Sequence, residues 1–248
     1  MATYSVLSTK FSPCDLLLFR GSDFISKTIM KVESYEVGYG EYSHVGMVVN
    51  SDVLPHIPQL KKGRWYVLES TCTIPYVTDG VPDVRTKATR FGVQIRDLEL
   101  VVNNYEKKGV VAWAKLNNNP WHKDKKHTAH KMDKVVNEVG WKPYEYRLIN
   151  LIAAAFPWFR RGRLWFDEFE SEAYHALSTL GFADDKTPKQ VEEMTLFCSQ
   201  LVALVYRALG VISHDIDPSD VMPVEFLRPR IKSMEGVVQD PIVILPQA

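Results

Sequence analysis

The sequence has few cysteines and no net charge, and each of these absences argues against a class of protein. Its 3 cysteines form no Cys-x-x-Cys pair, which argues against a disulfide framework and against a structural zinc site. Its 30 lysine and arginine residues balance 30 aspartate and glutamate residues, so no overall field attracts nucleic acid. We therefore expect a protein of a reducing compartment that has no nucleic-acid partner.

No apolar run is long enough to cross a bilayer, which takes about 20 residues. The longest run, from Leu148 to Phe159, is interrupted by Asn150 and Pro157. Aromatic residues and arginines alternate over residues 148–166, which predicts either a buried helix or a segment of peripheral membrane contact. The first ten residues lack the basic start and apolar core of a secretory signal. We expect a cytoplasmic protein, or one delivered from the cytosol without a cleaved signal, as in a viral or effector setting.

The remaining polar motifs indicate neither a phosphate-binding loop nor a metal site. The glycine-rich residues 37–41 are not followed by the pattern Gly-x-x-x-x-Gly-Lys. His122, His127 and His130 lie among lysines, but the nearby carboxylates stand at awkward offsets for a helical pair of metal ligands. We predict a solvated basic face here, no metal, and no cofactor for the protein as a whole.

One cysteine opens a helix whose opposite face is apolar. The apolar positions recur every three to four residues and are Leu201, Val202, Leu204, Val205, Ala208 and Leu209. Gly210 stands where a left-handed C-cap is expected, so the helix begins near Cys198. Free N–H groups and the positive end of the helix dipole favour the thiolate there. Cys198 is therefore a candidate nucleophile, with a small buried apolar residue as the alternative.

Two upstream strands carry the partners that such a nucleophile needs. His44 stands at the start of an apolar strand, and Glu69 ends a second strand over 64–70. If the strands are neighbours, the carboxylate can orient the imidazole and stabilise the imidazolium. We predict Cys198 as the nucleophile, His44 as the general base and Glu69 as its orienting residue. The backbone N–H of Cys198 is a candidate oxyanion donor.

These elements resemble, in this order, the circularly permuted papain-like branch of the NlpC superfamily. The branch includes YiiX and YebB-like proteins, viral relatives and lecithin:retinol acyltransferase-like enzymes, and in it the histidine strand precedes the cysteine helix. The resemblance spans about residues 12–210, and the family often has glycine where this chain has Cys14. The matching stretches are Cys14-Asp-Leu-Leu-Leu-Phe-Arg20, Tyr42-Ser-His-Val-Gly-Met-Val48, Val67-Leu-Glu-Ser70, Gly140-Trp-Lys-Pro-Tyr-Glu-Tyr146 and Phe197-Cys-Ser-Gln-Leu-Val202.

The resemblance implies an α+β fold, a mostly antiparallel sheet packed on a helical layer, and acyl transfer through a thioester on Cys198. We expect a peptidase or amidase. The alternatives are an acyltransferase or thioesterase acting on lipid or lipidated substrates, and a catalytically silent binding or structural module. The implied partners are peptide, amide or acyl-lipid substrates. The substrate groove is predicted to include Tyr144, Tyr146 and Ser199. For the two tyrosines, ordinary aromatic packing is the alternative to a substrate role.

The part of the chain that precedes residue 105 is predicted to supply most of the sheet. A first strand is predicted at 15–19, and one or two further strands at 91–102, giving a largely antiparallel sheet of five or six strands. A helix capped by Ser22 is predicted to run to about Glu33, because apolar residues recur on one side of it.

We predict that the whole chain, 1–248, is one catalytic domain with a helical insertion. The insertion spans about 105–190 and begins with a helix over 105–115, followed by another over 128–139. The residues from about 211 to 248 are proline-rich and are predicted to wrap the surface, with a last strand at 237–245.

Overall fold

The computed structural model describes residues 1–22, 24–37, 40–71, 80–89, 92–105, 109–140, 197–229 and 234–246. Their strands form one seven-stranded sheet of order β1-β7-β6-β2-β3-β4-β5. Neighbouring strands are antiparallel except β1 and β7. The fold is therefore mixed α/β with a mostly antiparallel sheet, larger than the predicted five or six strands. The strands are β1 (Ala2–Thr3), β2 (Leu16–Gly21), β3 (His44–Val49), β4 (Tyr66–Thr71), β5 (Gly92–Asp97), β6 (Gly109–Ala114) and β7 (Ile242–Leu245).

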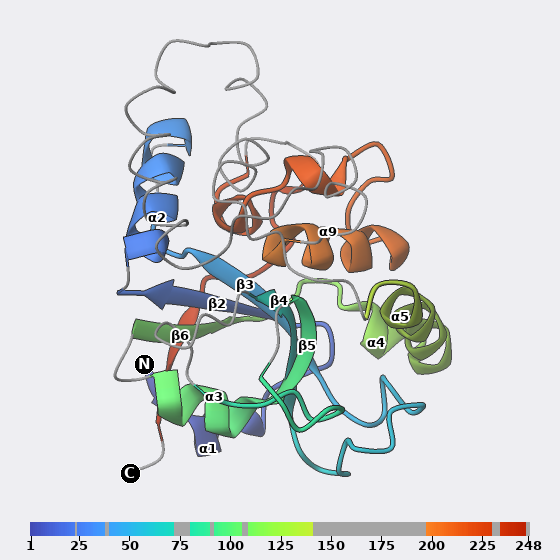
Figure 1. Ribbon diagram of the computed structural model, residues 1–248. Helices are drawn as coiled ribbons and strands as arrows, with labels where there is room; N and C mark the ends of the chain where they lie inside the picture. Colours follow the sequence, from blue (N-terminus) through green and yellow to red (C-terminus); the bar gives the residue numbers. More distant parts are fainter. Residues whose placement is uncertain are drawn as a thin grey trace, which may run out of the picture.

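Helices lie on both faces of this sheet (Figure 1). In the view of Figure 1, α2 and α9 lie above the sheet, α1 and α3 lie below it, and α5 flanks it on the right. The helices are α1 (Tyr4–Ser8), α2 (Phe24–Val37), α3 (Leu98–Tyr105), α4 (Pro120–Lys123), α5 (Lys125–Val139) and α9 (Cys198–Ala208), with 3-10 turns η1 (Pro218–Asp220) and η2 (Pro223–Phe226).

Alternate residues of the central strands pack into two separate cores. Leu16 and Leu18 of β2 belong to the core that includes the apolar face of α9. Leu17 and Phe19 belong to the core that includes α1 and α3. Side chains alternate between the two faces of a strand, so a strand covered on both faces is apolar throughout. The continuous apolar run of β2 follows from this double burial.

The helix predicted to open at Cys198 begins at that residue. Its apolar stripe is buried against β3 and β4, and Gly210 has the left-handed φ of 71° expected after its last turn. The hydroxyl of Tyr206 donates a 2.9 Å hydrogen bond to the carbonyl oxygen of Cys14. This bond joins the helix to the turn that precedes β2, so the helix start has a defined place over the sheet.

Cys14 forms that turn with a φ of 73°, in the left-handed region that favours glycine. The turn is held by the buried carboxylate of Asp15, which accepts hydrogen bonds from backbone and side-chain N–H groups. Its donors are Ser12 N (2.9 Å), Trp113 Nε1 (3.0 Å), Leu116 N (3.0 Å) and Asn119 Nδ2 (3.2 Å).

One predicted element is wrong and another is only partly present. The predicted helix over 105–115 is instead strand β6, paired with β2 on one side and β7 on the other. Its residues are almost all apolar, so their pattern fits either element, and the hydrogen bonds of two distant strands decide. Of the one or two strands predicted over 91–102, one is present as β5, and helix α3 follows it from Leu98. The Asp97 carboxylate accepts the Leu100 N–H at 3.2 Å, as an N-cap does.

The other predicted elements within the described residues are present with shifted ends. The first strand is Leu16–Gly21, the helix after it is Phe24–Val37, and the helix of the insertion begins at Lys125 rather than Thr128. The last strand is shorter than predicted, Ile242–Leu245. The predicted domain boundaries, the tyrosines Tyr144 and Tyr146, and the segment 148–166 lie wholly or partly outside the described residues.

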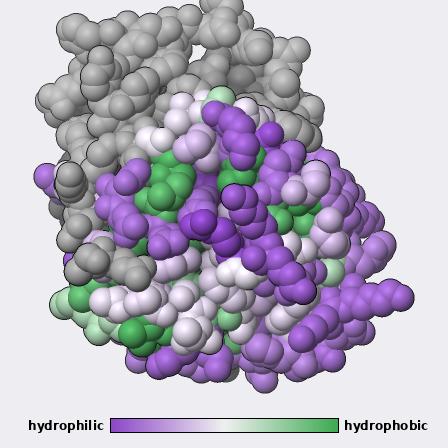
Figure 2. Space-filling model, turned by 90° about the horizontal axis from the view of Figure 1, so that it is seen from below, coloured by the Kyte–Doolittle hydropathy of each residue, from purple (hydrophilic) through white to green (hydrophobic). Residues whose placement is uncertain are grey.

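Figure 2 shows the face formed by α1 and α3, where hydrophilic residues surround separate apolar patches. The exposed large apolar residues of the described chain are Met1, Val6, Leu100, Ile242 and Leu245. Across the same described ranges, no helix combines the length and the apolar character that crossing a membrane requires.

Candidate active site

The fold brings Cys198, His44 and Glu69 into contact, although they are far apart in the sequence. His44 is the first residue of β3, Glu69 lies in the neighbouring strand β4, and Cys198 is the first residue of α9. The imidazole Nε2 of His44 lies 2.6 Å from Glu69 Oε2, and the imidazole also hydrogen-bonds the Cys198 thiol. Because Nε2 is engaged by the carboxylate, Nδ1 is the ring nitrogen available to the sulfur.

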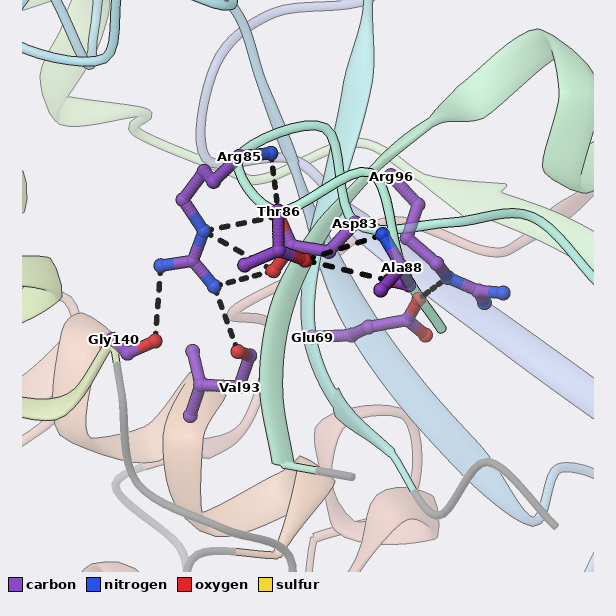
Figure 3. A network of polar contacts seen from close by, with 8 residues as sticks. All are labelled: Glu69, Asp83, Arg85, Thr86, Ala88, Val93, Arg96 and Gly140. Atoms are coloured by element: carbon purple, nitrogen blue, oxygen red, sulfur yellow. Dashed lines mark hydrogen bonds and ion pairs between the residues drawn. The ribbon is translucent and has the colours of Figure 1, made fainter. Parts of the chain in front are cut away.

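Glu69 is held from its other side by Arg96, a residue of β5. Arg96 Nε lies 2.5 Å from Glu69 Oε1, and both side chains are buried (Figure 3). Burial opposes ionisation of the carboxyl, but the Arg96 charge and the hydrogen bond and charge of His44 together lower the pKa of Glu69 to about 2. Glu69 is therefore an anion at neutral pH, and one carboxylate serves two cationic groups.

Gly46 makes room for this carboxylate beside His44. A Cβ at Gly46 would lie 2.6 Å from Val67 Cγ2 and 3.2 Å from Glu69 Cβ. These approaches are closer than side chains normally tolerate, so a larger residue would push the β4 side chains away. The absence of a side chain two residues after His44 thus fits the close packing of Glu69 in the next strand.

The thiol of Cys198 and the imidazole of His44 shift each other's pKa values in opposite directions. Burial favours the neutral thiol, but the charge and hydrogen bond of His44 and the backbone N–H groups of Val45 and Ser199 lower the pKa of Cys198. Burial also opposes the imidazolium, but the charge and hydrogen bond of Cys198 and the contact with Glu69 raise the pKa of His44 to about 10. These opposite shifts of the two pKa values favour a thiolate beside an imidazolium.

The imidazole ring and the sulfur are both fixed and largely shielded from water. The His44 side chain is 17% exposed, and its ring lies 5.1 Å from the ring of buried Phe19. Cys198 is 5% exposed. The predicted groove residue Ser199 is also buried, and its backbone N–H reaches the thiol. The histidine thus keeps a small exposed fraction beside a buried thiol.

A second buried ion pair lies beside Glu69 and Arg96 (Figure 3). Arg85 Nη2 lies 2.7 Å from Asp83 Oδ2, and the same guanidinium donates to the carbonyl oxygens of Val93 and Gly140 at 2.8 and 2.9 Å. Arg85 thereby joins the loop 80–89, strand β5 and the end of α5. It is a structural tie that fixes the strand from which Arg96 reaches Glu69.

Neither the burial of Arg96 nor the role of Gly46 follows from the sequence alone. Arg96 alternates with apolar neighbours, a pattern typical of a half-exposed strand, so no local signal indicates its burial. Gly46 belongs to the motif Tyr42-Ser-His-Val-Gly-Met-Val48, but the motif alone does not indicate that Glu69 packs against it. A third residue, Glu33 of α2, is also buried, and sequence periodicity alone gave no reason to choose it. Burial, and to a smaller extent the negative charges of Cys198 and Glu225, raise its pKa to about 9.

Histidines of the basic stretch do not gather into a ligand set in the described ranges. His122 lies 3.2 Å from the hydroxyl of Ser12, whereas His127 and His130 are exposed on α5. Over the part of the chain that the structure describes, no group of three or more His, Cys, Asp or Glu side chains could hold a metal ion.

A scan against protein-family models finds no matching family, and a search of curated proteins finds no matching sequence.

Proposed function

We propose that the protein is a cysteine hydrolase of the permuted papain-like type, acting as a peptidase or amidase through a thioester on Cys198. The observation that carries the proposal is the buried chain of contacts from the Cys198 thiol through His44 to Glu69. Two features of the chain support the family assignment: the histidine strand precedes the cysteine helix, and Cys14 has a backbone conformation suited to the glycine that the family often has there.

In the first half of the proposed reaction, the Cys198 thiolate attacks the carbonyl carbon of the substrate. The C=O bond opens to a tetrahedral oxyanion, which backbone N–H groups at the start of α9 can stabilise. The oxyanion then collapses, the bond to the leaving amine breaks, and the His44 imidazolium gives that amine its proton. The acyl group remains on sulfur as a thioester.

In the second half, neutral His44 takes a proton from water as the water attacks the thioester carbonyl. Collapse of the second tetrahedral intermediate releases the carboxylic acid product and returns the thiolate and the imidazolium. Glu69 stays ionised throughout and stabilises the imidazolium whenever it forms. An acceptor other than water at this step would make the protein an acyltransferase, and a thioester substrate would make it a thioesterase.

Selective alkylation tests the proposed nucleophile. Iodoacetamide at pH 6 is expected to modify Cys198 first, because its thiol is ionised by His44, and peptide mapping by mass spectrometry locates the label. Cys14 is the internal control, since burial and then the Asp15 charge raise the pKa of its thiol. His44→Ala should slow labelling of Cys198 alone. Equal labelling of the cysteines, unchanged by His44→Ala, would favour the silent module.

A panel of acyl probes tests the reaction class. Amides of peptides and esters of lipids are offered to the wild type and to Cys198→Ala, and thioester formation is followed by intact mass. We expect turnover of amides by the wild type only. Preference for lipid esters, or transfer of the acyl group to an added amine or alcohol, would replace the hydrolase with the lipid-acting alternatives.

A further inference from the structure

Strand β5 supplies a buried cation to the candidate active site. The register of β4 and β5 places Gln94 directly opposite Glu69, and Arg96 lies two residues further along on the same face. Gln94 is neutral, so the charge on this face of β5 that meets Glu69 is that of Arg96 (Figure 3). The Arg96 and Glu69 side chains are 5% and 0% exposed, so water screens their attraction little.

The two oxygens of the Glu69 carboxyl group have different partners. Oε1 lies 2.5 Å from Arg96 Nε, and Oε2 lies 2.6 Å from His44 Nε2. Arg96 can only donate and keeps its charge, so its bond requires an oxygen that accepts. The second bond shares one proton, which can lie on Nε2 of the imidazole or on Oε2 of the carboxyl group. The surroundings of the pair decide between these two positions.

Burial and Arg96 act on this proton in opposite directions. Burial alone favours the arrangement without charges, in which a neutral carboxyl group faces a neutral imidazole. Arg96 favours the charged arrangement, because its guanidinium contacts the carboxylate directly whereas the carboxylate separates it from the His44 imidazolium. Among the groups that lower the pKa of Glu69, the Arg96 charge has the largest effect, ahead of the hydrogen bond and charge of His44.

The position of the proton determines what the imidazole can do for the thiol. With the proton on Nε2 and bound by Glu69, Nδ1 of His44 is the nitrogen that takes the proton of Cys198 and later gives it away. If the proton moved to Glu69, a neutral His44 would carry its remaining proton on Nδ1. That tautomer has no lone pair towards the sulfur and cannot accept the thiol proton.

We propose that Arg96 is a positioning residue of the active site: by binding Glu69 Oε1 it keeps the shared proton on His44 Nε2, so that Nδ1 exchanges protons with Cys198. Arg96 acts through Glu69 and contacts no reacting atom. This inference rests on the proposed acyl-transfer function, in which His44 first gives a proton to the leaving group and then takes one from water.

NMR can locate the shared proton without any substrate. The nitrogen chemical shifts of the imidazole distinguish an imidazolium from each neutral tautomer, and loss of the signal in His44→Ala assigns it. Cys198→Ala serves as the background, because it removes the thiolate charge from the ring. Near neutral pH we expect an imidazolium when Arg96 is present and a neutral ring with its proton on Nδ1 in Arg96→Met. Arg96→Lys retains the charge and should restore the imidazolium.

The reactivity of Cys198 tests whether Arg96 acts through Glu69. Arg96→Met should slow alkylation by iodoacetamide at pH 6 by about 10-fold, because the thiol ionises less readily. It should slow turnover of p-nitrophenyl acetate by about 100-fold, the lower end of what general acid–base catalysis contributes. In a Glu69→Gln background the same substitution should change neither rate, because the residue that transmits its effect is gone.

A surface arginine provides the matched control. Arg64 also pairs with two carboxylates, Asp97 at 3.2 Å and Glu99 at 3.0 Å, but its side chain is 43% exposed. Arg64→Met should therefore leave both rates and the His44 signal unchanged. Circular dichroism verifies that each variant is folded. If Arg96→Met does not fold, Arg96→Gln, which retains a donor without the charge, replaces it in every measurement.

Three results would overturn the inference. An imidazolium that persists in Arg96→Met would mean that Glu69 holds its charge without Arg96. Equal slowing by Arg96→Met in the wild-type and Glu69→Gln backgrounds would mean that its effect does not pass through Glu69. A wild type that is acylated by p-nitrophenyl acetate, with Arg96→Met just as fast, would remove the positioning role and leave the proposed function intact. A wild type that is alkylated at Cys198 but never acylated would instead overturn the proposed function, and this inference with it.

Discussion

Glu69→Gln is the substitution that tests how much the charge of Glu69 contributes to the stability of the fold and to activity. Glu69 lies between two cationic partners, His44 Nε2 at 2.6 Å and Arg96 Nε at 2.5 Å, and is wholly buried. Glutamine keeps the shape of the side chain and removes the charge. The variant therefore leaves the Arg96 guanidinium and the His44 imidazolium facing a neutral amide in a place with little access to water.

The magnitude of the loss follows from the pKa of Glu69, which falls from 4.5 to about 2 on folding. Each pH unit of such a shift corresponds to about 1.4 kcal/mol, so the charge contributes about 3 kcal/mol to the free energy of unfolding at pH 7. A depressed carboxyl pKa gives stability that is fully present above pH 4.5 and is lost as the pH falls through 2. By pH 3 the contribution is less than half as large.

Urea unfolding of the wild type and of Glu69→Gln at pH 7 and pH 3 measures both values. Glu138→Gln, a change at an exposed carboxylate on α5, is the matched control and should leave the unfolding free energy unchanged. Equal stability of wild type and Glu69→Gln at pH 7, or an equal loss at both pH values, would refute the electrostatic account. The double variant Glu69→Gln, Arg96→Met should recover part of the stability and none of the activity, because His44 still lacks its anion.

Three further predictions concern the surroundings of the site. Gly46→Ala should lower the free energy of unfolding by about 1–3 kcal/mol and reduce activity, because its Cβ meets Val67 and Glu69; unchanged urea unfolding and turnover would contradict this. Glu33→Gln should stabilise the fold by about 3 kcal/mol at pH 7, since the raised pKa of Glu33 costs stability as the pH rises from 4.5 towards 9; the gain should vanish below pH 4.5 in thermal unfolding. If residues 148–166 contact membranes, the wild type should sediment with liposomes and the Trp158→Ala, Phe159→Ala variant should not; absence of binding in both would favour a buried helix.

The sequence by itself determined the elements whose pattern is local. Helix α9 has a long apolar periodicity and a C-terminal glycine, so its start at Cys198 could be predicted. His44 and Glu69 could be paired because each stood in a short apolar strand, and the structure places them at 2.6 Å. In these cases one continuous stretch of chain holds the whole signal, and few alternative structures suit it.

Only the tertiary structure decided the elements that depend on distant partners. Residues 109–114 are apolar enough for a helix or a strand, and they form a strand because β2 and β7 satisfy their backbone groups. The burial of Arg96 and Glu33 follows likewise from packing against residues far along the chain. Burial raises the pKa of both carboxyls, but the charges and hydrogen bonds of Arg96 and His44 reverse this for Glu69 and lower its pKa to about 2. The pKa of Glu33 stays raised, at about 9, by burial and then by nearby negative charges. Two glutamates with the same intrinsic chemistry thus acquire different charge states, because only one of them is buried against cations.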